Sequence, residues 1–215
     1  MSSRSQRSGR LFVISAPSGA GKTSLVNALL QADRRLVSSV SHTTRPKRQG
    51  EKEGKHYYFT ARADFLALKS KSAFLEYANV FGHLYGTTVK SVDIHLTNGL
   101  DVILEIDWQG AQQVRQQMPD AVSIFILPPS RDELERRLAS RGTDEHAVIA
   151  RRMRDAISEM SHYHEYDYLV VNDDFTTAFQ ELQSLVISRR LSRPVMSERH
   201  APLLAALLSQ APAVE

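Results

Sequence analysis

The chain has 215 residues, of which 42% are hydrophobic and 24% charged, and its formal net charge is +3. These values fit one soluble globular domain with a sizeable core, and a charge this small does not by itself indicate a nucleic-acid partner. The absence of cysteine excludes disulfides, a thiolate nucleophile and cysteine-bound zinc.

The first residues, 1–9, are polar and basic and lack the apolar core of a signal peptide. No apolar stretch reaches the roughly 20 residues that cross a bilayer. We therefore expect a disordered lead-in, no membrane partner and a cytoplasmic location.

A small-residue segment over residues 15–24, SAPSGAGKTS, connects an apolar run at 11–16 to a helical pattern at 22–31. A strand, such a loop and a helix in this order predict a phosphate-binding loop, because backbone N–H groups and the positive end of the helix dipole surround an anion. Lys22 adds a cation near the outer phosphates, and the Thr23 hydroxyl lies where Mg²⁺ is held. The general pattern GxxxxGK[ST] has glycine where this chain has Ala16, and a turn that merely contains lysine is the alternative.

A polar segment over residues 39–88 follows, rich in Tyr, Thr, Gly and Arg. It carries strand-like pieces at 40–44, 56–60 and 74–80 and one helical piece at 63–70. These short pieces predict a small β-rich insertion in an α/β core.

Two kinds of chemistry are gathered in this insertion. Arg45 and Arg48 lie three positions apart around a rigid proline and suit a clamp for a phosphate dianion, although such a run can also be a solvated loop. Glu76 can accept the two N–H bonds that guanine offers at N1 and the 2-amino group, and that adenine does not offer; an edge-strand charge is the alternative. Hydroxyls at Ser41 and Thr87 can donate to the guanine O6.

The rest of the chain alternates between apolar runs at 101–107, 122–127 and 168–171 and helical patterns at 109–117, 131–140, 143–162 and 176–190. Near-continuous apolar strands that alternate with helices predict a parallel α/β sheet flanked by helices. Ser130 is a candidate N-cap, with Glu133 at the capping-box position. Glu105 and Asp107 end the first of these runs, where a parallel strand brings acidic groups to the ligand crevice.

The last segment, 194–215, contains an Ala/Leu-rich patch at 202–208. It is compatible with a short helix, packed either on the core or on a partner. The sequence leaves both open, together with a homodimer or larger homo-oligomer.

Taken together, residues 10–190 resemble the guanylate kinases, the P-loop nucleoside monophosphate kinases that phosphorylate GMP. The motifs that carry the resemblance are the loop at 16–23, SHTTRP at 41–46, Gly50-Glu51, Gly54 and Tyr57, Phe74 and Glu76, Tyr85-Gly86-Thr87, Glu105-Ile106-Asp107 with Gln109-Gly110, Pro128-Pro129-Ser130, and Arg141-Gly142-Thr143. The resemblance implies a P-loop kinase core at 10–38 and 89–193, a GMP-binding insertion at 39–88 and a helical lid at about 136–155. Bacterial members look alike at Ala16.

The resemblance also implies which residues bind ATP. They form the phosphate loop, with one residue near the adenine end: Ala16, Pro17, Ser18, Gly19, Ala20, Gly21, Lys22, Thr23, Ser24 and Asn172. For Asn172, a turn or helix-cap role is the alternative.

The GMP site that the resemblance implies has a base-reading part, a phosphate-gripping part and residues beside them. They are Ser41, Glu76 and Thr87 for the base, Arg45, Arg48, Tyr57 and Tyr85 for the phosphate, and Gly86, Glu105 and Asp107. Glu105 and Asp107 can instead orient Lys22, Thr23 or metal-bound waters.

The implied reaction is ATP + GMP giving ADP + GDP in purine nucleotide metabolism, with Mg²⁺ as cofactor and dGMP as a further acceptor. The residues implied in transfer are Lys22, Arg45 and the lid arginines Arg137, Arg141 and Arg152. The alternatives are a non-catalytic guanylate kinase-like protein-interaction domain and a P-loop kinase for another acceptor.

Overall fold

Five parallel strands form the larger of two sheets in the structure, a computed structural model that describes residues 9–80, 82–140 and 146–209. Their order is β2-β7-β1-β8-β9, so the first strand along the chain lies at the centre. This confirms the predicted α/β class with a parallel sheet. The strands are β1 (Leu11–Ser15), β2 (Leu36–Ser38), β7 (Asp101–Glu105), β8 (Val122–Leu127) and β9 (Tyr168–Val171).

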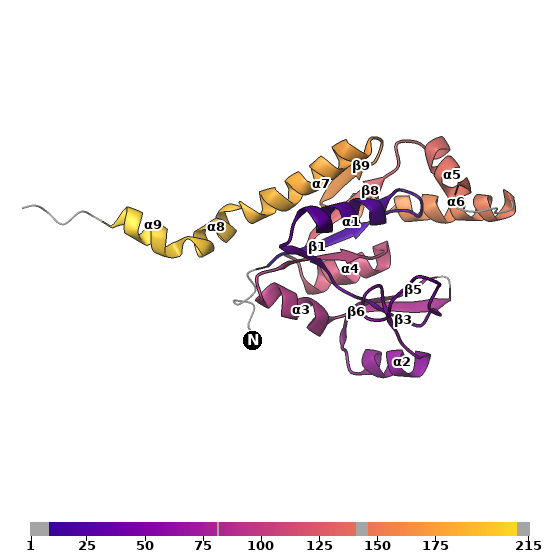
Figure 1. The fold of residues 1–215 in the computed structure, drawn as a ribbon, viewed down its shortest axis with the longest axis horizontal. Coiled ribbons are helices and arrows are strands. Elements are labelled where there is room, and N and C mark those ends of the chain that lie inside the picture. The colour runs from indigo at the N-terminus through magenta and orange to yellow at the C-terminus, as the bar shows by residue number, and fades with distance from the viewer. Residues whose placement is uncertain (1–8, 81, 141–145, 210–215) are drawn as a thin grey trace, which may run out of the picture.

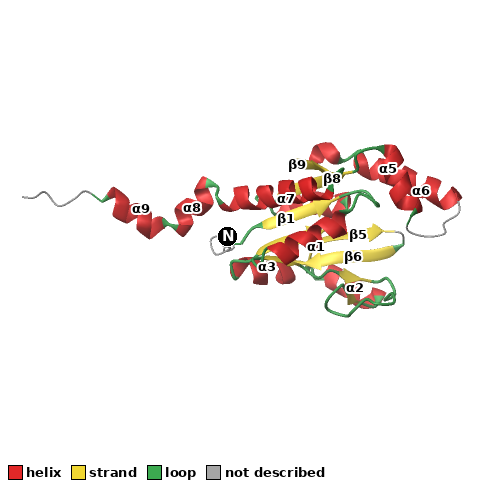
Figure 2. Cartoon of the chain, turned by 45° about the horizontal axis from the view of Figure 1, so that its top comes forward, coloured by secondary structure: helices red, strands yellow, loops and turns green. Residues whose placement is uncertain are grey.

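Helices cover both faces of this sheet, as Figures 1 and 2 show. One face carries the helix that follows β1 together with the long helix near the end of the chain, and two others cover the opposite face. In that order they are α1 (Lys22–Ala32), α7 (Phe175–Arg190), α3 (Val89–Thr97) and α4 (Trp108–Gln117).

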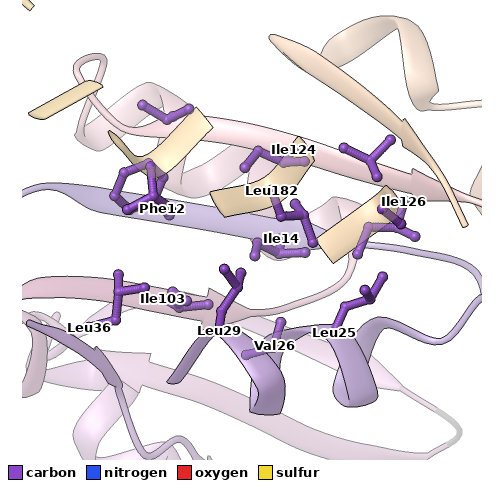
Figure 3. Packing of buried hydrophobic residues seen from close by; sticks show 14 of the residues in the cluster. Phe12, Ile14, Leu25, Val26, Leu29, Leu36, Ile103, Ile124, Ile126 and Leu182 are labelled. Atoms are coloured by element: carbon purple, nitrogen blue, oxygen red, sulfur yellow. The ribbon is translucent and has the colours of Figure 1, made fainter. Parts of the chain in front are cut away.

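The central strand β1 contributes side chains to the two hydrophobic cores that lie on opposite faces of the large sheet. Its successive side chains point to opposite faces, so Ile14 packs with Leu25 and Leu29 of α1 (Figure 3), while Val13 packs in the core that contains Val114 of α4. Every residue of β1 is buried. Each large apolar side chain removed from water in this way contributes roughly 1.5–3 kcal/mol.

The second sheet has four strands in the order β4-β3-β6-β5. All of them, and the helix α2 (Arg62–Ser70), lie within residues 39–88, where a β-rich insertion is predicted; the division into domains itself stays a prediction. Figure 1 shows this sheet and α2 on one side of the five-stranded sheet. Its strands are β3 (His42–Thr43), β4 (Tyr58–Phe59), β5 (Phe74–Val80) and β6 (His83–Thr88).

Two helices, α5 (Arg131–Ala139) and α6 (His146–Met160), form the described part of the segment predicted as a lid, of which residues 141–145 lie outside the described residues. A 3₁₀ turn, Tyr163–Glu165, leads from α6 to β9. The Ser130 side chain accepts a hydrogen bond from the Glu133 N–H at 3.1 Å, which confirms the predicted N-cap. The reciprocal half of the capping box is wrong, because the Glu133 carboxylate binds arginine side chains of its own helix instead.

The chain ends in α8 (Arg193–Arg199) and α9 (Ala201–Leu208). Figure 1 shows both extending beyond α7, away from the sheets, and α9 has no buried residue. The short helix predicted at 202–208 is present, but it does not pack on the core. The predicted lead-in lies outside the described residues except for Gly9, whose N–H donates to the Leu96 carbonyl. Among the described helices, none is long and apolar enough to cross a membrane.

Candidate active site

A cavity of about 400 Å³ opens where the phosphate loop, the carboxyl end of β7 and the second sheet meet. Most of the predicted site residues line it, which makes it the place where polar groups from distant segments converge. Its walls are formed by Ala16, Pro17, Ser18, Gly19, Gly21, Lys22, Thr23, Ser41, Arg48, Tyr57, Glu76, Ala78, Val80, Tyr85, Glu105, Ile106, Asp107 and Glu159.

The loop between β1 and α1 has the backbone that a phosphate loop needs. Gly19 and Gly21 have φ of 92° and 91°, a left-handed conformation that favours glycine. At Gly21 a side chain is also excluded by space, since a Cβ would lie 2.3 Å from the amide nitrogen of Asn172. Ser24, predicted at the end of the loop, is exposed on α1 and does not line the cavity.

Asn172 supports this loop from behind. Its side-chain Nδ2 donates to the Ala20 carbonyl at 2.7 Å, and its own carbonyl accepts from Arg137 Nη2 at 3.1 Å. The helix-cap role falls to Asp174, which accepts from the Thr177 N–H. Asn172 thus connects α5 to the loop and does not line the cavity.

Lys22 lies on the floor of the cavity, with its Nζ 3.5 Å from the carbonyl oxygen of Ile106. Burial lowers the pKa of the ammonium group, because it disfavours the charged form, and the nearby carboxylates of Glu105, Glu159 and Asp107 oppose that shift. The ammonium group of Lys22 therefore lies near three carboxylates that favour its charged form.

The two acidic residues at the end of β7 have different contacts. Glu105 Oε2 accepts from the Thr23 hydroxyl at 3.2 Å, and Asp107 caps α4 by accepting from the Gly110 N–H at 2.9 Å. Both side chains face the cavity. Glu105 therefore orients Thr23, and Asp107 fixes the start of α4.

Glu159 is a cavity residue that the sequence patterns do not indicate. It lies near the end of α6, and its Oε2 accepts from the Ser18 N–H of the phosphate loop at 3.1 Å. Burial raises the pKa of this carboxyl, while the Ser18 hydrogen bond and the charge of Lys22 lower it. A carboxylate near the end of α6, just beyond the segment predicted as a lid, thus occupies one of the loop's N–H donors.

Glu76 on β5, Thr87 on β6 and Ser41, which directly precedes β3, lie together. Thr87 Oγ1 donates to Glu76 Oε1 at 2.6 Å, so the Ser41 hydroxyl, 2.8 Å from Thr87 Oγ1, is the donor in that contact. Glu76 is only 3% exposed. Burial raises the pKa of its carboxyl to about 7, against the Thr87 hydrogen bond, which lowers it.

The two predicted clamp arginines differ in their surroundings. Arg45 is buried, and its guanidinium forms a bidentate pair with Glu51, at 2.7 and 3.1 Å, and donates from Nε to the Tyr85 hydroxyl. This pairing lowers the pKa of Glu51 to about 2. Arg48, with Tyr57, lines the cavity. Glu51 thus holds the guanidinium of Arg45 in place, a role that the presence of a carboxylate at this position in the sequence does not by itself indicate.

Three further predicted residues, Gly86, Arg137 and Arg152, do not line the cavity. Gly86 packs under β5, where a Cβ would lie 3.0 Å from the Glu76 carbonyl and from two phenylalanine rings. Arg137 Nε donates to Glu133 at 2.6 Å, and Arg152 is half-buried on α6. Arg141 lies outside the described residues.

A phosphate loop after the central strand of a parallel sheet, facing a second sheet with its own cationic and carboxylate side chains, defines a P-loop nucleotide kinase. Comparisons with known proteins agree. The sequence matches the guanylate kinase family over residues 8–189. The guanylate kinase of Alkalilimnicola ehrlichii is 58% identical, over 93% of this chain and 97% of its own. That of Escherichia coli K12 is 53% identical, over 94% and 98%.

A solved structure is also similar. The crystal structure of guanylate kinase from Anaplasma phagocytophilum has a TM-score of 0.72 and 36% identity, over 89% of this chain and 95% of that one. The chain belongs to the guanylate kinase family and is a nucleoside monophosphate kinase. None of these relatives favours the non-catalytic alternative.

Proposed function

We propose how this guanylate kinase, which transfers the γ-phosphoryl group of ATP to GMP, uses the residues around its cavity. The observation that carries the proposal is that one cavity is lined both by the phosphate loop and by the second sheet. A donor and an acceptor nucleotide can therefore meet with their phosphates in one cavity, which is what phosphoryl transfer requires.

The donor half is the phosphate loop. The loop N–H groups and Lys22 hold the ATP phosphates, and the Ser18 N–H becomes free for them when Glu159 moves away. Asn172 acts through the loop, because it binds the Ala20 carbonyl rather than the cavity. It is a positioning residue for ATP.

The acceptor half lies on the second sheet and on the connection between its strands β3 and β4. Glu76 accepts the two N–H bonds of guanine, and Arg48, Tyr57 and Tyr85 hold the GMP phosphate. Arg45 joins them through the Tyr85 hydroxyl, with Glu51 fixing its guanidinium. Because these contacts address the base and the phosphate, they do not depend on the 2′-hydroxyl, and dGMP is a second acceptor.

Transfer needs alignment and charge neutralisation rather than a covalent intermediate on the protein. A phosphate oxygen of GMP attacks the γ-phosphorus, the bond to the β-phosphate oxygen breaks, and ADP leaves. Since the attacking phosphate is already anionic, no general base is required. Lys22 neutralises the donor, and the lid arginines Arg137, Arg141 and Arg152 close over the migrating group and exclude water.

The residues present fit Mg²⁺ as cofactor. The Thr23 hydroxyl and the Glu105 carboxylate are hard oxygen donors 3.2 Å apart beside the loop. Within the described residues no group of three or more His, Asp or Glu side chains forms a metal cage, which suits an ion that keeps waters and phosphate oxygens. When bound, the ion neutralises phosphate charge. Homo-oligomerisation and a cytoplasmic location stay predictions.

A coupled assay of ATP-dependent phosphorylation tests the proposed function. Across GMP, AMP, UMP and CMP, we expect GMP to be used with the highest kcat/KM, by a factor of about 10⁴ or more over AMP, because a site built to accept two N–H bonds rejects a base without them. Equal use of GMP and AMP would refute the guanine-reading role of Glu76. Binding without turnover would favour the non-catalytic alternative.

The kcat/KM for GMP is expected to rise with pH through about 7. Only the ionised Glu76 carboxylate accepts both N–H bonds, and burial raises its pKa to about 7. Below that value each pH unit costs about tenfold in the competent fraction. The GMP phosphate itself titrates near pH 6, so Glu76→Gln is the control: the variant should keep the change near 6 and lose the one near 7. Superimposable profiles would contradict the assignment.

A further inference from the structure

We propose that Gly110, Gln113 and Gln117, on one face of α4, are positioning residues that set where the Glu76 carboxylate lies and so determine the preference for guanine. The inference rests on the proposed role of Glu76. These residues follow one another at helical spacing, so they share the face of α4 that meets β5. None of the three lines the cavity.

Gly110 provides the space for the carboxylate. A Cβ at this position would lie 2.7 Å from Glu76 Oε2 and 3.3 Å from the Ile106 side chain. Its φ is not in the left-handed region, so the backbone does not require glycine here. Glycine at 110 therefore has a packing reason, and that reason is the second oxygen of Glu76, whose first oxygen is held by Thr87.

β5 is irregular at the same place. In its pairing with β6, Phe74 faces Thr88 and Glu76 faces Thr87, which leaves Leu75 as an extra residue. Such a bulge turns a side chain in a direction that regular pairing does not allow. The bulge therefore aims Glu76 at the cavity, provided that the strand is held in this shape.

Gln113 and Gln117 hold β5 in this bulged shape. Gln117 Nε2 donates to the carbonyl of Leu75, the bulged residue, at 2.7 Å. Gln113 makes a pair of bonds with Tyr77, donating to its carbonyl at 2.8 Å and accepting from its N–H at 3.1 Å. The residues on both sides of Glu76 are thus fixed to α4.

The same helix begins at the core side of the cavity, where Asp107 is its N-cap. α4 therefore connects the carboxyl end of β7 to the strand that carries Glu76. A displacement of β5 along or away from α4 would move the two N–H acceptors relative to the phosphate loop. The hydrogen bonds from Gln113 and Gln117 to β5 do not involve the phosphate loop, so we expect the contact between α4 and β5 to affect reading of the base more than ATP binding.

Gly110→Ala is the main test. Alanine favours a helix more than glycine does, so the variant is expected to fold. Its kcat/KM is measured with GMP and with inosine 5′-monophosphate, which lacks the 2-amino group. We expect the ratio between the two to fall by about tenfold or more, because a hydrogen bond to a charged group is lost, with the KM for ATP unchanged. The double variant Gln113→Ala, Gln117→Ala should lower the ratio as well.

Gln112→Ala is the matched control, since Gln112 is exposed on the same helix. It should keep the wild-type ratio. Loss of activity on both acceptors by the same factor in Gly110→Ala and in the double variant would indicate a merely structural role and overturn the inference. Glu76→Gln separates the two proposals. If this variant loses the discrimination between the two acceptors while the α4 variants keep it, only this inference fails. If Glu76→Gln keeps the discrimination as well, the proposed role of Glu76 also fails.

Discussion

Replacing Lys22 with alanine is expected to lower kcat by about 10²–10³-fold, the usual loss when one group that stabilises transferring charge is removed. Lys22 lies among Glu105, Asp107 and Glu159, which influence its pKa. Without its charge these carboxylates face the ATP phosphates unopposed, so both ATP binding and transfer suffer. GMP binding should change little, since the proposed GMP contacts lie on the second sheet and on the connection between β3 and β4. Steady-state kinetics and calorimetric titration with GMP check both parts.

The matched control is Lys71→Ala, at an exposed lysine that ends α2. It removes the same charge at a residue that does not line the cavity and should leave kcat unchanged. Turnover close to that of the wild type in Lys22→Ala would show that the loop does not serve the transferred phosphate. A loss confined to GMP affinity would place Lys22 on the acceptor side instead.

Strands of the large sheet are predictable where they form an apolar run. The inner strand β8 is buried almost throughout, whereas only Val170 is buried in the edge strand β9, so β9 is predictable from its apolar residue types rather than from burial on both faces. β8 and β9 match the apolar runs at 122–127 and 168–171, and β5 matches the piece at 74–80. β2 is missed because it has three residues and only Leu36 is buried. α3 follows β6 without an intervening loop, and its cap, the Thr88 side chain that accepts from the Ser91 N–H, is also the last residue of that strand. Because Thr88 is both the last residue of β6 and the N-cap of α3, no turn or loop residues mark the boundary between them, and neither element is predicted.

The residues of the site also fall into those that the sequence predicts and those that it does not. Lys22, Thr23 and Glu76 follow from local motifs or from the chemistry of the residue type. Glu159 does not, because its contact with Ser18 spans 141 positions and its helix resembles an ordinary charged surface helix. Gly110 is part of the family motif, but the physical reason for glycine at this position is the space that Glu76 occupies, and that space exists only once α4 and β5 are packed. Long-range contacts of this kind leave no periodicity in the sequence.

Glu76→Gln is expected to reduce kcat/KM for GMP by about 10²-fold or more. The carboxylate is buried and accepts from Thr87, and it offers guanine two acceptors. A glutamine presents one acceptor and one donor, so one guanine N–H would face an N–H. Polar sites discriminate strongly for this reason. The AMP rate should fall far less, which a coupled assay with both acceptors measures.

The same substitution should stabilise the protein without nucleotide. A pKa of about 7 against an ordinary 4.5 means that folding disfavours the ionised form, at a cost of up to about 3 kcal/mol. The cost is absent below pH 4.5, where both states are protonated, grows as pH rises and is complete above about 7. Glutamine has no such cost. The gain in Tm of Glu76→Gln should therefore be small at pH 4.5 and large at pH 8.

Thermal unfolding of wild type and variant at both pH values separates this effect from packing changes, which do not depend on pH. Glu181→Gln, at an exposed glutamate of α7, is the control and should show no pH-dependent gain. A Tm gain of the same size at pH 4.5 and pH 8 would mean that folding does not raise the pKa of the Glu76 carboxyl group. Stability gained together with GMP use lost would show that the chain keeps a costly buried carboxylate because guanine recognition requires it.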